Sequence, residues 1–211
     1  TQLYISVDAP NEELFNIIDR PIIKNAWQGL YRTLSMLPKL REKMRTVLRF
    51  TLIKKLNMDY PEQWAEIIKM SNPMFVEVKA YMWVGMSRER LEQENMPLHE
   101  EIVAFSQELL KFLPDYDIVS EHIPSRVVMF SKKSFQRNGT WYTWIDFPKF
   151  HELVLSGKEF SSKDYLRVTP QTGISGKGTK EHHAMIEEQR KKKKESMYVN
   201  ESTDELEFWN E

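Results

Sequence analysis

The sequence contains no cysteine among its 211 residues. This absence excludes disulfide bonds, and it excludes a zinc site or iron–sulfur cluster held by thiolates of this chain. No apolar run approaches the roughly 20 residues that a membrane-spanning helix needs, and no signal-peptide pattern is visible. The sequence therefore predicts a cytoplasmic protein without a membrane segment.

The last 17 residues contain no Lys or Arg, although basic residues are frequent just before them. Residues 195–211 hold six acidic residues and no Lys or Arg, so the net charge of −1 leaves +5 on residues 1–194. Arg190–Lys194 is a run of five cations. Such a run binds nucleic-acid phosphates through counterion release or serves as a localisation signal, and a plain solvated charge run is the simplest alternative. We expect 172–211 to be a disordered tail, first basic and then acidic.

Three segments alternate between apolar and polar residues with a period of two, which is typical of strands. They are Leu3–Asp8, Thr46–Ile53 and Phe75–Tyr81. One face of each is apolar. The other face is predicted to carry polar side chains from all three segments: Tyr4, Ser6, Asp8, Arg49, Thr51, Glu77, Lys79 and Tyr81.

Amphipathic helical patterns lie between these strands, so the connections are β-α-β and the sheet should be parallel. Parallel sheets normally have both faces covered, and a repeated polar face therefore suggests the lumen of a barrel. An open sheet with one solvated face is the alternative. The fold class is α/β. Further along, the pattern predicts a helix over 98–113, strands at 118–119 and 127–130, a hairpin around Gly139 and a helix over 150–155.

In α/β barrels, functional residues gather at the carboxyl ends of strands and in the loops that follow. This rule selects Ser6, Asp8, Thr51, Lys54, Asn57, Lys79 and Tyr81. Asp8 could accept hydrogen bonds from a ribose or an amino group, and Lys54 or Lys79 could hold a carboxylate. Lys79, beside Glu77, could also form a Schiff base. The alternative is that Glu77–Lys79 and Asp8–Arg49 are structural ion pairs.

Hydroxyl and guanidinium groups recur in two later loops, at Ser87, Arg88 and Arg90 and again at Ser125 and Arg126. Arginine suits phosphate and carboxylate recognition because its planar group donates parallel hydrogen bonds. Ordinary surface arginines are the simpler explanation for each taken singly. The histidines lack the spacing of a metal site, and we assign no metal to them.

Several segments resemble, in order and spacing, the carboxyl-terminal half of the 4-demethylwyosine synthases. They are TQLYISVDAP, RTVLRFTLIKKLNM, FVEVKAYMWVGMSRERLEQENMPLHEE and PSRVVMF, and GTWYTWIDFPKFHEL and SGKEFSSKDYLRVTP resemble the eukaryotic extension. The resemblance implies that 1–97 form the last three βα units of a partial (βα)6 radical SAM barrel, similar to a TIM barrel. It also implies that 98–171 form a small α+β region for wyosine base formation.

The resemblance further implies a tRNA-modifying reaction, in which pyruvate-derived carbons are joined to N1-methylguanosine beside the anticodon of tRNA-Phe. In the complete enzyme we assign Ser6, Asp8, Thr51 and Asn57 to the S-adenosylmethionine (SAM) side. We assign Lys54, Lys79, Ser87, Arg88, Arg90, Ser125 and Arg126 to the substrate or tRNA side.

The family's CxxxCxxC motif and pyruvate-binding lysine would lie upstream of Thr1, so the [4Fe-4S] cluster and the catalytic residues are expected outside this chain. FMN would belong to a separate flavodoxin-like domain. The segment alone should be inactive. A non-catalytic tRNA-binding module and a Schiff-base lyase using Lys79 are the alternatives.

Overall fold

The computed structural model describes residues 2–41 and 43–169, and the predicted tail over 172–211 lies outside these residues. The longer strands are β1 (Gln2–Val7), β2 (Arg45–Leu52), β3 (Phe75–Ala80), β4 (Tyr116–His122) and β5 (Val127–Lys132). The α-helices are α1 (Glu12–Ile18), α2 (Ala26–Leu40), α3 (Pro61–Ser71), α4 (His99–Leu110) and α5 (Phe147–Leu155). Four 3₁₀ turns within the same residues are η1 (Gly85–Glu89), η2 (Gln93–Asn95), η3 (Ile123–Ser125) and η4 (Lys133–Phe135).

The five longer strands form one open sheet in the order β1-β2-β3-β5-β4. The β1–β2 and β2–β3 pairs are parallel, as the sequence predicts, whereas β5 runs antiparallel to both of its neighbours. Strand β1 is an edge strand of this sheet. Because β4 and β5 complete the same sheet, the sheet continues past the boundary that the sequence places after residue 97.

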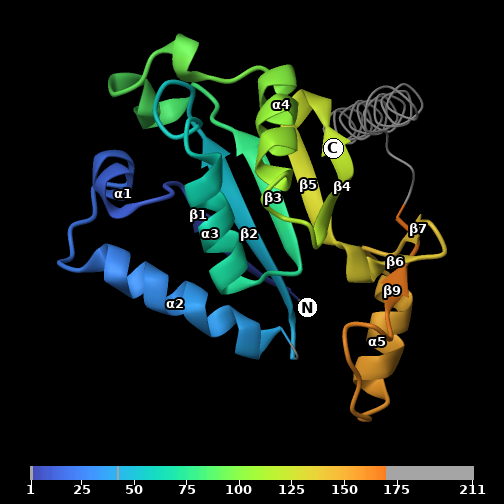
Figure 1. The fold of residues 1–211 in the computed structure, drawn as a ribbon. Coiled ribbons are helices and arrows are strands. Elements are labelled where there is room, and N and C mark those ends of the chain that lie inside the picture. Colours follow the sequence, from blue (N-terminus) through green and yellow to red (C-terminus); the bar gives the residue numbers. More distant parts are fainter. Residues whose placement is uncertain (1, 42, 170–211) are drawn as a thin grey trace, which may run out of the picture. The chain divides into compact units, whose positions relative to one another are not determined.

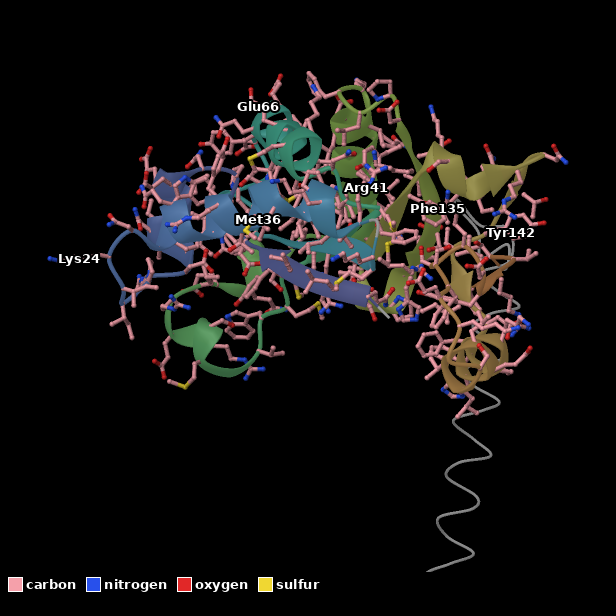
Figure 2. The ribbon with its side chains drawn as sticks, turned by 90° about the horizontal axis from the view of Figure 1, so that it is seen from below. Lys24, Met36, Arg41, Glu66, Phe135 and Tyr142 are labelled. Atoms are coloured by element: carbon pink, nitrogen blue, oxygen red, sulfur yellow. The ribbon has the colours of Figure 1, made fainter. Side chains whose placement is uncertain are left out.

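Helices α2, α3 and α4 lie on one side of the sheet (Figure 1). Figure 2 labels Met36 on α2 and Glu66 on α3, both on this helical side. The predicted apolar face of the strands packs there, so that Leu48, Phe50 and Val78 are fully buried with Trp64 of α3. The Phe50 and Trp64 rings are 4.2 Å apart between centroids. Burial of these large side chains fixes which face of the sheet the helices cover.

The polar face follows from the strand register. Ser6 lies opposite Arg49, and Arg49 lies opposite Glu77. Thr51 lies opposite Lys79 on the same face. The prediction that these side chains share one side of the sheet is therefore confirmed, because paired residues of neighbouring strands point the same way. Tyr4, Ser6 and Arg49 are exposed on this face.

Short elements follow β5 and cover the amino-terminal part of the polar face. The strands are β6 (Gln136–Arg137), β7 (Thr140–Trp141), β8 (Trp144–Ile145) and β9 (Leu166–Arg167). The predicted hairpin is β6–β7, in which Asn138 and Gly139 both have positive φ, as a tight turn requires. Phe135 and Trp141 pack on Val47 and Phe75 of the sheet.

Candidate functional site

A cavity of about 540 Å³ opens at the carboxyl ends of β1, β2 and β3, where the barrel rule places function. Its volume falls within the range of small-molecule sites. Its polar lining mixes both charges with hydroxyl and amide groups, and it consists of Asp8, Asp19, Arg20, Thr51, Lys55, Tyr81, Ser87, Arg90 and Asn95. Such a lining can hold a ligand that carries both positive and negative groups.

Asp8 directly follows β1 and sits in the inner wall of this cavity. Its Oδ1 is buried and has no hydrogen-bond partner among the described residues. Burial raises the pKa of Asp8, and hydrogen bonding by Thr51 opposes that rise. A buried acceptor without a partner is costly, so Asp8 is suited to receive a hydrogen bond from a ligand hydroxyl or amino group.

Asp19 follows the short helix α1, which begins where Asn11 accepts a hydrogen bond from the backbone N–H of Leu14. Loss of hydration and, to a smaller extent, the negative charge of Asp8 raise the pKa of Asp19, which is about 6. The positive charge of Arg90 acts in the opposite direction. Two carboxyl groups in one cavity therefore both have a raised pKa, which is typical of functional sites.

The segment that follows β3 forms another wall. Tyr81 donates a hydrogen bond to Ser87 at 2.8 Å, and Ser87 donates to the carbonyl of Val84 at 2.6 Å. Arg90 donates to the carbonyl of Ile18 at 3.4 Å, which links this wall to the end of α1. Ser87 and Arg90, both predicted from the sequence, are thus brought together with Asp8 and Thr51.

Asn57 does not line the cavity, but it hydrogen-bonds to the backbone of two residues that do. Its side chain accepts from the N–H of Ile53 at 2.6 Å and donates to the carbonyls of Asp8 and Thr51 at 2.9 Å each. The main-chain carbonyl of Asn57 accepts a hydrogen bond from the indole N–H of Trp64. Because Asn57 is fully buried and its amide is used within the chain, its place here is structural.

Three other predicted residues lie near the cavity without lining it. Ser6 is exposed on the open face of β1. Lys54 forms an ion pair with Glu101 of α4. Lys79 is half-buried on β3, opposite Thr51 and Val127. The cavity therefore does not contain the lysines that the sequence suggested for holding a carboxylate.

Arg88, Ser125 and Arg126 also lie outside the cavity. The guanidinium of Arg88 stacks over Trp83, 4.8 Å from the ring centroid. Arg126 donates to the carbonyl of Pro97 at 2.6 Å. Ser125 is half-buried in η3, just before Arg126.

The polar face holds a different ion pair from those of the alternative interpretation. Arg49 pairs with Glu77 at 3.0 Å, because the strand register puts these two residues side by side. The alternative interpretation paired Asp8 with Arg49 and Glu77 with Lys79, whereas Arg49 and Glu77 pair with each other. Arg49 also lies over the ring of Tyr4.

Asp19, Arg20, Lys55 and Asn95 line the cavity but were not singled out in the sequence. Their common property is position: each lies in a loop or turn after one of the first three strands. The barrel rule that selected Asp8 would have found them if it had been extended to the whole of each loop.

The residues present do not fit an iron–sulfur cluster, since the chain has no cysteine. The described residues also contain no group of three or more His, Asp or Glu side chains that could hold a metal ion. Within the same residues, no helix is long and apolar enough to cross a bilayer.

Comparison with known proteins gives one consistent result. The family model described as wyosine base formation matches residues 70–132. The S-adenosyl-L-methionine-dependent tRNA 4-demethylwyosine synthase TYW1 of Mus musculus is 41% identical over 183 residues, covering 83% of this chain and 25% of that protein. The corresponding synthase of Oryza sativa subsp. japonica is 40% identical over 180 residues, covering 83% of this chain and 27% of that protein.

Solved structures agree. "Structure of TYW1 with a lysine-pyruvate adduct bound" aligns with a TM-score of 0.56 and 31% identity, covering 66% of this chain and 43% of that one. "Crystal structure of archaeal TYW1" aligns with a TM-score of 0.51 and 27% identity, covering 66% of this chain and 42% of that one. The chain spans about a quarter of the length of the curated relatives. Its predicted resemblance to the 4-demethylwyosine synthases is thus confirmed in both sequence and mixed α/β fold.

Proposed function

We propose that this chain forms the carboxyl-terminal half of the radical SAM barrel of a tRNA 4-demethylwyosine synthase. The observation that carries the proposal is the cavity at the carboxyl ends of three parallel strands, within a chain that is 41% identical to such a synthase. In this proposal the polar sheet face faces the barrel lumen, and the rest of a longer protein supplies the other strands and the cluster cysteines.

The SAM side of the cavity would be formed by Asp8 and Thr51. The buried, unpartnered Oδ1 of Asp8 fits an acceptor for a ribose hydroxyl or an ammonium group. When bound beside a cluster held elsewhere in the enzyme, SAM would supply the radical that starts the reaction. Asn57 would hold the Asp8 and Thr51 backbones in place through its two donated hydrogen bonds.

The substrate side would be formed by Ser87 and Arg90, with Arg20 and Lys55 at the same cavity. Guanidinium and ammonium groups at a cavity wall would bind the phosphates that flank the target nucleotide. The proposed reaction joins pyruvate-derived carbons to N1-methylguanosine beside the anticodon of tRNA-Phe. A pyruvate-binding lysine would come from outside this chain.

A chimera tests the proposal. The span of the mouse synthase that aligns with this chain is replaced by this chain, and the chimera is expressed in cells that lack the synthase. Tricyclic nucleosides in tRNA hydrolysates are then measured by liquid chromatography. We expect product from the chimera, a loss of at least tenfold in the D8A and R90Q chimeras, and full product from an R32Q control, which changes an exposed arginine of α2.

A chimera that folds and gives no product would contradict the proposal and favour a non-catalytic tRNA-binding module. Binding separates the two readings further. Arg88→Gln and Arg90→Gln should weaken tRNA binding more than binding of an unstructured RNA of equal length. Equal losses of affinity for both RNAs would mean that these arginines act only as non-specific surface charge.

A further inference from the structure

A buried arginine lies at the opposite end of the sheet from the first cavity. Arg45, the first residue of β2, is only 4% exposed. Its guanidinium donates to the carbonyl of Thr143 and stacks on Phe75, 4.6 Å from the ring centroid. Its Nε and Nη1 have no hydrogen-bond partner among the described residues. A buried guanidinium with unused donors is costly unless an anion meets it.

Arg45 lines a second cavity, of about 310 Å³. The lining contains no acidic residue, so nothing in it neutralises the arginine. Three aromatic residues of the lining are exposed: Tyr4, Trp144 and Phe147. The cavity thus combines one buried cation with a rim of exposed rings.

This second cavity is distinct from the first. Its lining includes Gln2, Val47 and Phe75, from the amino-terminal parts of β1, β2 and β3, and the two cavities share no lining residue. From Gln2 to Asp8, a strand rising about 3.3 Å per residue covers roughly 20 Å.

We propose that the second cavity binds a nucleotide phosphate, with Arg45 holding the phosphate and Trp144 and Phe147 stacking on the base. The arginine selects an oxyanion, and the exposed rings select a flat group attached to it. The unused nitrogens of Arg45 are buried. Phosphate binding therefore requires a rotation of a rim side chain, a change that is common at binding sites.

The phosphate can come from a free mononucleotide or from an unpaired nucleotide of an RNA chain. The RNA source rests on the proposed function, because a bound tRNA would extend beyond the first cavity and could place such a nucleotide here. The binding chemistry at Arg45 is the same for both sources.

Nuclear magnetic resonance of the ¹⁵N-labelled full chain tests the proposal through the Arg45 Nε–H resonance, assigned as the one lost in R45K. Uridine 5′-monophosphate should shift this resonance, inorganic phosphate should do so at least tenfold more weakly, and uridine should leave it unchanged. Trp144→Ala should weaken the mononucleotide about tenfold, as expected for one lost base–aromatic stack. The control Y31A, which removes an exposed ring of α2, should have no effect.

A short single-stranded RNA separates the two sources. A shift at lower concentrations than the mononucleotide supports the RNA source, and a shift with the mononucleotide alone supports the free nucleotide. Glutamate binding as tightly as the mononucleotide, or no shift with any nucleotide, would overturn the proposal. If R45K does not fold, the Arg45 Nε–H resonance can be assigned in the wild type through its proximity to the Phe75 ring. The comparison of wild type with W144A then still tests the proposal. These outcomes do not depend on the Arg90 chimera, so either proposal can fail alone.

Discussion

At the scale of single residues, two carboxyl groups in one cavity differ in how their neighbours act on them. Asp8 is held in the inner wall beside Thr51, whereas Asp19 lies at the end of α1 near Arg90. Loss of hydration is the largest influence on the pKa of each residue, and the charge of Asp8 adds to the rise at Asp19. The pKa of Asp19 therefore reports on the charge of Asp8.

The pKa of Asp19, raised to about 6, should respond in opposite directions to two neighbouring substitutions. Asp8→Asn removes a negative charge and should lower the pKa of Asp19, although not to its ordinary value, because loss of hydration remains the main cause. Arg90→Gln removes a positive charge and should raise it. Carbon-detected NMR titration of the Asp19 carboxyl group measures both. A shift in the same direction for both variants would refute the described arrangement.

The raised pKa of Asp19 also makes stability depend on pH. Its folded-state pKa of about 6 lies above the ordinary 3.8, so between these values the folded state binds more protons than the unfolded state. The contribution of Asp19 to the free energy of unfolding therefore falls as pH rises through this window. Asp19→Asn should be more stable than the parent at pH 7 and equal to it near pH 3.5. Urea denaturation at both pH values checks this, and an equal gain at both would contradict it.

At the scale of elements, the turn after β2 positions the cavity wall. Asn57 makes three side-chain hydrogen bonds to backbone groups, and Trp64 of α3 donates to its carbonyl. One buried residue, through its side chain and its main-chain carbonyl, thereby links β2, α3 and the residue that follows β1. Each of these buried polar groups therefore has a partner within the chain.

Asn57→Ala should therefore destabilise the chain by about 2–4 kcal/mol, since it leaves buried backbone groups without partners. Asn16→Ala, at an exposed position of α1, should change stability by less than about 0.5 kcal/mol. Urea denaturation of both variants gives the comparison. A loss at Asn57 no larger than at Asn16 would show that the turn does not depend on this network.

At the scale of the whole molecule, the sheet is open and its polar face is partly exposed, with Arg49 and Tyr4 accessible. Elements after β5 cover only the amino-terminal part of that face. The proposed barrel would cover the remainder with strands from elsewhere in the protein.

The chain alone should bind no iron–sulfur cluster, because it has no cysteine to ligate one. After anaerobic reconstitution with iron and sulfide we expect no broad visible absorption of a cluster and no 5′-deoxyadenosine from SAM. The full-length mouse synthase is the positive control. A cluster on this chain would mean that its ligands are not the expected cysteines.

The basic run Arg190–Lys194 lies outside the described residues, and its role stays a prediction. If it binds tRNA, replacing its five cations with neutral residues should reduce the slope of log K against log salt by about four to five units. Titrations of tRNA at several salt concentrations measure the slope. An unchanged slope would assign tRNA contact to residues 1–169.

The sequence by itself determined the parallel part of the sheet. Alternation with a period of two placed β1, β2 and β3 and put Ser6, Arg49 and Glu77 on one face, because strand geometry is local and side-chain direction follows it. The helical patterns between these strands predicted that they are parallel. It also selected Asp8 and Thr51 by the rule that function follows strand ends, and Ser87 and Arg90 by the hydroxyl and guanidinium groups of the later loop, and all four line one cavity.

Only the tertiary structure decided which polar residues are used internally and which face the cavity. Asn57 and Thr51 lie six residues apart at the same strand end, yet one is enclosed by backbone groups and the other lines the cavity. Arg49 pairs with Glu77 and Lys54 with Glu101 because register and helix packing bring distant residues together. Burial and pairing depend on such distant contacts, and the raised pKa of Asp19 and the unpartnered Arg45 could therefore not be read from the order of residues.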